Sequence, residues 1–217
     1  MKTIKLSWDF EKIIPIYGFN KADTRVKQLK SIKKSGSSNT FSFYLENHWG
    51  THIDAPAHFY NNGKKITDFN PEYFIFHKPF VLNLNKKSGQ AIQAGDLNKI
   101  TGNPDLLLIK TGFSKFRGKK EYSCNNPYLL PEISSWLKKF KKSVRAIGID
   151  TVSISNMNHR EIGRQTHRNL LEPKNPILII EDMDLSRDLS KLKSVWVAPL
   201  FFKQLDSAAC TIFGFLK

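Results

Sequence analysis

The sequence contains little cysteine and no long hydrophobic run. Its only cysteines, Cys124 and Cys210, stand far apart and belong to no Cys-x-x-Cys pair. This argues against a cysteine-based metal site and fits a reducing compartment. No stretch of about 18 apolar residues is present to span a bilayer, and the opening MKTIKLSWDFEK has too short an apolar segment for a signal peptide. We therefore expect a cytoplasmic protein with no membrane partner.

Acidic residues are also scarce relative to basic ones. The chain has 34 lysines and arginines against 19 aspartates and glutamates, a net charge of +15. Such an excess can indicate binding to nucleic acid or to an anionic membrane. Here the lysines fall in short scattered groups, for example within 27–34 and 138–142, and no nucleic-acid-binding motif accompanies them. We interpret them as a solvated surface that could also attract an anionic substrate, and we expect no nucleic-acid partner.

Hydrophobic residues make up 40% of the 217 residues, enough for the core of one domain spanning 1–217. A helix is predicted over 131–142, because Ile133, Trp136, Leu137 and Phe140 recur at helical spacing, which makes Trp136 a core residue. The alternation of strands and helices predicts an α/β fold with a mixed sheet. Residues 113–126 are expected to form a long loop near the substrate entrance. Strand-like apolar runs occur at 41–45, 80–84, 106–109, 144–149, 177–180 and 195–197.

The segment 48–59, HWGTHIDAPAHF, carries three histidines and an aspartate. Gly50 and Pro56 disfavour a helix there. In extended chain, positions 48, 52, 54 and 58 share one parity, so their side chains leave on one side of the backbone. Pro56 cannot donate to a sheet, so we expect a strand that ends near residue 54 and a turn that returns residue 58 to the same spot. Imidazoles and a carboxylate suit zinc or manganese, whereas each histidine alone would be an ordinary surface or core residue.

The Gly-Thr-His-x-Asp-x-Pro-x-His core of this segment resembles the metal-dependent cyclase family, which includes bacterial kynurenine formamidases and isatin hydrolases. The resemblance continues through LIKTG at 108–112, IGIDTVS at 147–153 and THRNLLEPKNPILIIEDMDL at 166–185. It implies a single-domain, swivelling β/α/β barrel-like fold with a mixed sheet. It also implies a homodimer and one or two bound Zn²⁺ ions, with Mn²⁺ as the alternative.

The resemblance further implies roles for individual residues. Asp54 would bridge two ions, and His58 would be the catalytic proton carrier. His167 is expected to open a helix and Glu181 to end the next strand, with Glu172 as a competing carboxylate. The implied metal ligands are His48, His52, Asp54, His167 and Glu181.

Substrate recognition is less clearly defined by the resemblance. Tyr17, in PIYGFN at 15–20, falls where the family places an aromatic residue against the substrate ring. Two family arginines are absent, because Lys110 and Thr211 occupy their positions, and Ala209 replaces a proline. Asp150 and Ser153 end an apolar run, and a functional role and a loop-holding role are equally compatible with Asp150.

Together these features predict a metal-dependent hydrolase that cleaves an amide, in particular an aryl formamide such as N-formylkynurenine. The metal would lower the pKa of a bound water, and His58 would move the proton. One alternative keeps the site and changes the substrate to a cyclic amide, imide or lactone, as in isatin hydrolases. The other is a non-catalytic basic binding protein on the same fold, which the intact set of ligands disfavours.

Overall fold

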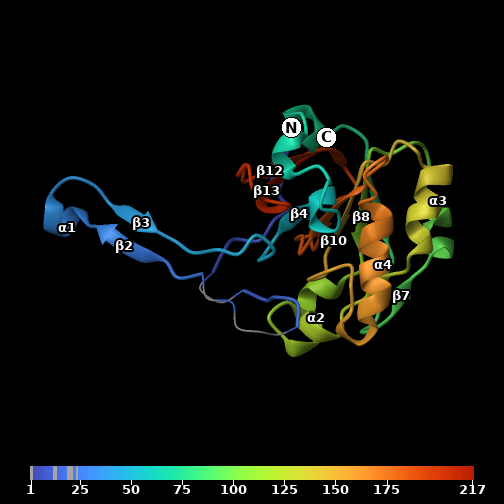
Figure 1. Ribbon diagram of the computed structural model, residues 1–217, viewed down its shortest axis with the longest axis horizontal. Helices are drawn as coiled ribbons and strands as arrows, with labels where there is room; N and C mark the ends of the chain where they lie inside the picture. Colours follow the sequence, from blue (N-terminus) through green and yellow to red (C-terminus); the bar gives the residue numbers. More distant parts are fainter. Residues whose placement is uncertain (1, 12–13, 19–21, 23) are drawn as a thin grey trace.

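The computed structural model describes residues 2–11, 14–18, 22 and 24–217. A nine-stranded mixed sheet forms its centre (Figure 1). Strands β6 and β12, near opposite ends of the strand order, also approach each other, so the sheet curls towards a barrel. The order is β5 (Ile75–Phe76), β12 (Leu192–Pro199), β13 (Ser207–Leu216), β4 (His52–Asp54), β11 (Leu178–Glu181), β10 (Ala146–Ile149), β8 (Leu106–Lys110) and β6 (Pro79–Asn83), with β1 (Lys2–Lys5) added to β13.

Four neighbouring strands, β6, β8, β10 and β11, run parallel. Their central members are continuous apolar runs with buried side chains, as expected for parallel strands that are covered on both faces. Helices α3 (Glu132–Phe140) and α4 (Arg160–Leu170) lie side by side over this part of the sheet (Figure 1). The predicted α/β class with a mixed, barrel-like sheet is confirmed.

Helix α3 follows the predicted pattern closely. It starts after Pro131, and Ile133 and Leu137 are fully buried while Trp136 packs against the core. Phe140, the fourth apolar residue of the pattern, is instead exposed at the end of the helix. The helix therefore buries a narrower face than its sequence indicates.

A hairpin projects away from the sheet (Figure 1). It consists of β2 (Lys27–Lys30), the short helix α1 (Ile32–Ser35) and β3 (Thr40–Ser42). The strand predicted at 41–45 is shorter than expected and belongs to this hairpin: among the described strands it pairs with β2 and not with the central sheet. Apolar side chains on and beside the hairpin are exposed: Val26, Leu29, Ile32, Phe41 and Phe43.

The segment 113–126 is not the long loop that was predicted. It contains a 3-10 helix (Phe113–Phe116) and helix α2 (Lys120–Cys124), and Phe113 and Tyr122 are buried in a small apolar cluster that Tyr17 also contacts. Because these two rings need burial, the segment folds onto the body of the protein.

The remaining elements are short. Among the described residues, no helix is long and apolar enough to cross a membrane. The short elements are the 3-10 helices Pro56–His58, Ile66–Asp68, Pro71–Phe74, Ala94–Lys99 and Met157–His159, and the paired strands β7 (Ala91–Ile92) and β9 (Tyr128–Leu129).

Candidate metal centre

Strand β4 places two candidate ligands on one face of the sheet. It is three residues long and lies between β11 and β13, so that His52 is directly opposite Glu181, and Asp54 is opposite Ser207. His52, Asp54 and Glu181 are almost completely buried. The strand ends where Pro56 begins a 3-10 turn, as predicted.

His48 and His58 reach the same place from outside the strand. His58 sits in the 3-10 turn after β4, and His48 lies in the turn before it, with ring centroids 4.2 Å apart. Gly50 makes the approach of His48 compatible with β4, because its φ of +67° is left-handed and the Phe10 ring occupies the space of a Cβ. All four predicted positions therefore converge, although only residues 52 and 54 do so by strand alternation.

His167 and Glu181 complete the cluster. Glu181 ends β11, as predicted, whereas His167 lies in the last turn of α4 and does not open a helix. Helix α4 begins at Arg160, directly after the 3-10 helix Met157–His159, whose first turn is capped by the Asn156 side chain accepting a hydrogen bond from the Asn158 amide. Glu172, the competing carboxylate, lies apart from the cluster and pairs with Lys138.

The donor atoms of the cluster have the spacing of ligands around a metal ion. Oδ1 of Asp54 is 3.3 Å from Nδ1 of His48 and 3.6 Å from Nε2 of His52, and Oδ2 is 4.0 Å from Nε2 of His167. Glu181 lies 3.4 Å from Nε2 of His52 and 3.4 Å from Nε2 of His167. Two ligands held at about 2.0–2.1 Å by one tetrahedral ion lie roughly 3.4 Å apart.

Three of these atoms lack any other partner. Nε2 of His52 and both carboxylate oxygens of Asp54 are buried and have no hydrogen-bond partner in the described part of the chain. An unpaired carboxylate inside a protein is strongly unfavourable unless a cation neutralises it. The residues present therefore fit a divalent metal ion.

Two histidines are also oriented as metal ligands usually are. Nδ1 of His52 lies 2.8 Å from the Gly50 carbonyl oxygen, and Nδ1 of His167 lies 2.8 Å from the Gly163 carbonyl oxygen. When each Nδ1 donates its proton to that carbonyl, Nε2 is left as a lone pair facing the cluster. Gly163 allows this placement, because a Cβ there would collide with Ser155 and push α4 away.

In the absence of a metal, the imidazoles and carboxylates of the cluster stabilise each other's charged forms. Burial lowers the pKa of His52, but the carboxylates of Glu181 and Asp54 outweigh it and raise the pKa to about 9. Burial raises the pKa of Glu181, and His167 and His52 outweigh that effect, so its pKa is held well below the usual range. Without metal, a proton on His52 therefore occupies part of the site near neutral pH.

We expect metal binding near pH 7 to release a proton from His52. Because a ligand must be deprotonated, the affinity should rise by up to tenfold per pH unit for each proton released and level off above about pH 9. Calorimetric titration with Zn²⁺ in buffers of different ionisation enthalpy measures the number of protons. An affinity and a heat that are independent of pH and buffer would contradict this expectation.

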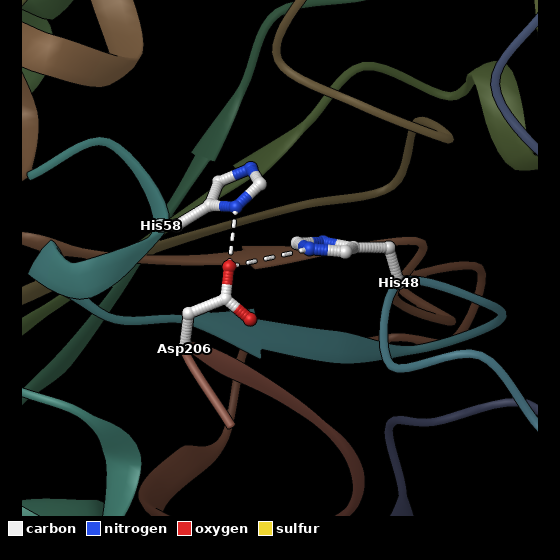
Figure 2. Close-up of side chains that lie close together, drawn as sticks. All are labelled: His48, His58 and Asp206. Carbon is white, nitrogen blue, oxygen red and sulfur yellow. Dashed lines mark hydrogen bonds and ion pairs between the residues drawn. The ribbon is translucent and has the colours of Figure 1, made fainter. Parts of the chain in front are cut away.

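Sequence analysis missed Asp206. Its Oδ2 lies 2.8 Å from Nδ1 of His58 and 3.9 Å from Nε2 of His48, and Figure 2 shows it between the two rings. Asn47 donates a hydrogen bond of 2.8 Å to the other oxygen. Burial lowers the pKa of His58, but Asp206 and the other nearby carboxylates outweigh it and raise the pKa. Asp206, His48 and His58 also form a second group of donor atoms with metal-ligand spacing.

A second missed feature is a buried ion pair behind the cluster. Asp182 follows Glu181 with a φ of +50°. Its carboxylate accepts hydrogen bonds from Nε and Nη2 of Arg117, the Nη2 bond being 2.8 Å long, and one of 2.5 Å from the Tyr122 hydroxyl. The Arg117 guanidinium lies over the Trp8 ring. These contacts hold the segment 113–126 against the strand end that carries Glu181.

Arg117→Met should lower the free energy of unfolding by about 3 kcal/mol, because it leaves the Asp182 carboxylate buried without its cation. Urea unfolding at a fixed metal concentration measures the change. Arg187→Met, at an exposed position, is the matched control and should change stability by less than about 0.5 kcal/mol. Equal effects of the two substitutions would show that the buried pair does not stabilise the fold.

Of the other residues singled out from the sequence, Ser153 contacts the cluster, whereas Asp150 and Lys110 make their contacts elsewhere. Asp150 accepts hydrogen bonds from the amide and hydroxyl of Thr111 and from the Gly112 amide, so it holds a loop. Ser153 instead donates to Oε1 of Glu181 at 3.0 Å. Lys110 donates to the backbone carbonyl oxygen of Arg187 and is not among the residues that line the site.

A cavity of about 530 Å³ opens above the cluster. It is lined by Tyr17, Phe59, Met157, Arg160 and Arg164, together with the four histidines of the cluster, Asp54 and Glu181. Tyr17 therefore lies at the site, although Asn20, in the same sequence segment, is outside the described residues. A cavity of this size accommodates a small molecule.

A barrel-like mixed sheet with a buried His, Asp and Glu cluster beneath a cavity is the architecture of a metal-dependent enzyme. Residues 4–156 match the family model Cyclase, described as putative cyclase, and the chain belongs to this family. The kynurenine formamidase of Geobacillus thermodenitrificans is 32% identical over 162 residues, which cover 73% of each chain. The kynurenine formamidase of Bacillus thuringiensis subsp. konkukian is 32% identical over 180 residues, or 82% of this chain and 80% of that one.

Solved structures agree on the fold. Isatin hydrolase A from Ralstonia solanacearum superposes with a TM-score of 0.81 at 16% identity, covering 100% of this chain and 92% of that one. A potential metal-dependent hydrolase with cyclase activity superposes with a TM-score of 0.75 at 21% identity, covering 100% and 98%. The predicted family resemblance and fold are confirmed.

Proposed function

We propose that this protein is a metal-dependent hydrolase that cleaves an aryl formamide such as N-formylkynurenine. The prediction of an amide-hydrolysing enzyme is confirmed by its relationship to the kynurenine formamidases. The observation that carries the metal dependence is the buried Asp54 carboxylate, whose two unpartnered oxygens lie among three imidazoles.

Five side chains are proposed to hold the metal. Asp54 faces His48 and His52 through one oxygen and His167 through the other, which supports a bridging role between two ions. Nitrogen and carboxylate ligands suit Zn²⁺ and also Mn²⁺. When bound, such an ion polarises a carbonyl group and makes water a nucleophile near neutral pH. The proposed ligands are His48, His52, Asp54, His167 and Glu181.

His58 is proposed to carry the proton. The Asp206 carboxylate engages Nδ1, which fixes the ring and leaves Nε2 for the reacting groups in the cavity. Because both Asp206 and the cluster carboxylates favour the imidazolium form, His58 can accept a proton from water and return it to the leaving nitrogen. An amine leaves poorly without that proton.

Asp206→Asn should lower kcat by about 10- to 100-fold while the metal content stays unchanged. The asparagine keeps the shape but removes the charge that stabilises protonated His58, an effect comparable to the loss of one outer-shell partner. Steady-state kinetics and elemental analysis of the same preparation measure both quantities. A fall in metal content would instead make Asp206 a ligand.

Tyr17 is proposed to contact the aromatic ring of the substrate. It forms part of the cavity wall and is half-buried, so its ring can stack on an aryl group. Structural similarity to isatin hydrolase A keeps a cyclic amide as the second candidate substrate.

The wider predictions on assembly and location remain proposals. Residues 1–217 would form one hydrolase domain in the cytoplasm, assembled as a homodimer. The projecting hairpin supports the dimer, because its exposed apolar side chains, including Leu29 and Phe41, need a partner surface. Light scattering should then give twice the chain mass of 24.9 kDa.

The test of the function is elemental analysis of the purified protein combined with hydrolysis of N-formylkynurenine and of isatin before and after chelation. Stoichiometric metal and chelator-sensitive release of formate support the proposal. Turnover of isatin alone would favour the cyclic amide, and bound metal without hydrolysis of either compound would overturn both.

A further inference from the structure

We propose that Arg160 and Arg164 form a carboxylate-binding subsite at the entrance of the metal cavity, so that the preferred amide substrate carries a carboxylate remote from the bond that is cleaved. This inference rests on the proposed hydrolase function and specifies its substrate class. It concerns two residues of α4 that take no part in the cluster of candidate ligands.

Helix geometry places these arginines in one row with a candidate ligand. Arg160, Arg164 and His167 are separated by four and three residues, so their side chains share one face of α4. All three line the same cavity. His167 is buried, whereas both arginines are exposed, so the row runs from solvent to the cluster.

Both guanidinium groups are available to a ligand. Arg160 contacts the Met157 sulfur at 3.4 Å, and no carboxylate is paired with it in the described part of the chain. Arg164 pairs with Glu161, but these side chains are 57% and 82% exposed, and an exposed pair of this kind contributes little stability. A bound carboxylate can therefore replace Glu161 at small cost. In contrast, Arg117 is committed to its buried pair.

The positive charges of Arg160 and Arg164 act on the part of the cavity where a substrate carboxylate would bind. Burial raises the pKa of the Tyr17 hydroxyl, Glu181 adds to that effect, and Arg160 and Arg164 oppose it. The field of both arginines therefore reaches the space beside Tyr17. The cluster, with Asp54 and Glu181, repels an anion that approaches it without metal.

These charges orient an asymmetric substrate. Its carboxylate would face the guanidinium pair, which can bind both oxygens with parallel N–H donors, and its amide would face the cluster. With a rise of about 1.5 Å per residue, Arg164 and Arg160 stand roughly 4.5 and 10.5 Å from His167 along the helix axis. The carboxylate and the amide should accordingly be separated by several bonds, as they are in N-formylkynurenine.

The experiment compares N-formylkynurenine with its methyl ester, which lacks only the carboxylate charge, in the metal-loaded enzyme. We expect the wild type to prefer the acid and the double variant Arg160→Gln/Arg164→Gln to lower the ratio of the two kcat/KM values by about 10- to 100-fold, the range for hydrogen bonds to a charged group. The loss should appear mainly as a higher KM for the acid. Arg168→Gln, on the same helix but outside the cavity, is the control and should leave the ratio unchanged.

A ratio that is the same in the wild type and the double variant would overturn the subsite while the hydrolase function stands. If neither compound is hydrolysed, the proposed function fails, and binding of kynurenine and its methyl ester by calorimetry still decides on the subsite. A preference for the acid that the double variant loses supports it, and equal binding of both compounds overturns it.

Discussion

His58→Ala is expected to retain its full metal content and to lower kcat by about 10²- to 10⁴-fold, the range for removal of a general acid and base. The expectation follows from the position of His58. Its ring borders the cavity, but one nitrogen is occupied by Asp206, whereas the unpartnered buried donors of the cluster belong to other residues. Steady-state kinetics together with elemental analysis of the purified variant measure both effects.

His159→Ala provides the matched control, because His159 is exposed, stacks on Tyr128 and does not line the cavity. It should leave kcat and metal content unchanged. If His58→Ala lost metal, the group formed by His48, His58 and Asp206 would hold an ion, and the assignment of the proton carrier would have to change.

His52→Ala is expected to abolish both metal binding and turnover. The His52 side chain lies between Asp54 and Glu181, and its Nε2 faces both carboxylates without a hydrogen-bond partner in the described part of the chain. Its removal also deletes the positive charge that offsets two buried carboxylates in the metal-free protein. Elemental analysis after dialysis, followed by activity measurements at increasing Zn²⁺, gives the size of the loss.

A circular dichroism spectrum like that of the wild type is needed to show that the His52 variant still folds, and His77→Ala, at an exposed position, serves as the control substitution. Stoichiometric metal in a folded His52→Ala protein would mean that the ligands are assigned wrongly.

The parts of the fold that could be predicted from the sequence are those with a local physical signal. The parallel strands are uninterrupted apolar runs, and α3 has an apolar stripe, so both were located to within a few residues. Strand β13 was not among the apolar runs read from the sequence, because SAACTIFGFL begins with small residues, and only the family resemblance at Ala209 and Thr211 pointed to this region. Helix α4 was located only in part, because it is rich in charged and polar residues and packs against Ser155 through a glycine.

In the site, too, residues with a local sequence signal could be predicted, and residues brought in by tertiary pairing could not. The candidate ligands around β4 could be proposed from the sequence because histidines rarely occur at such density, and the structure brings them together. Asp206 is 148 residues from His58 in the sequence, and only the pairing of β4 with β13 brings the two together. It was nevertheless visible as the acidic residue that precedes the last strand. The pair of Arg117 with Asp182 has no local signal, since it depends on how the segment 113–126 folds back.

Alternate residues of the three-residue strand β4 face opposite sides of the sheet, one side the cluster and the other the apolar core. His52 and Asp54 face the cluster, and Ile53 between them points to the opposite side and is completely buried in the apolar core. A slip of one residue in its pairing would exchange these faces, placing an isoleucine at the cluster and two polar side chains in the core. If His52 and Asp54 bind the metal as proposed, metal binding would report on the register of the sheet, and only correctly paired chains would become active. Conservative substitutions of Ile53 should change the stability of the fold but leave the cluster residues in place. An insertion or deletion in β4 would disrupt the apolar core and the cluster together.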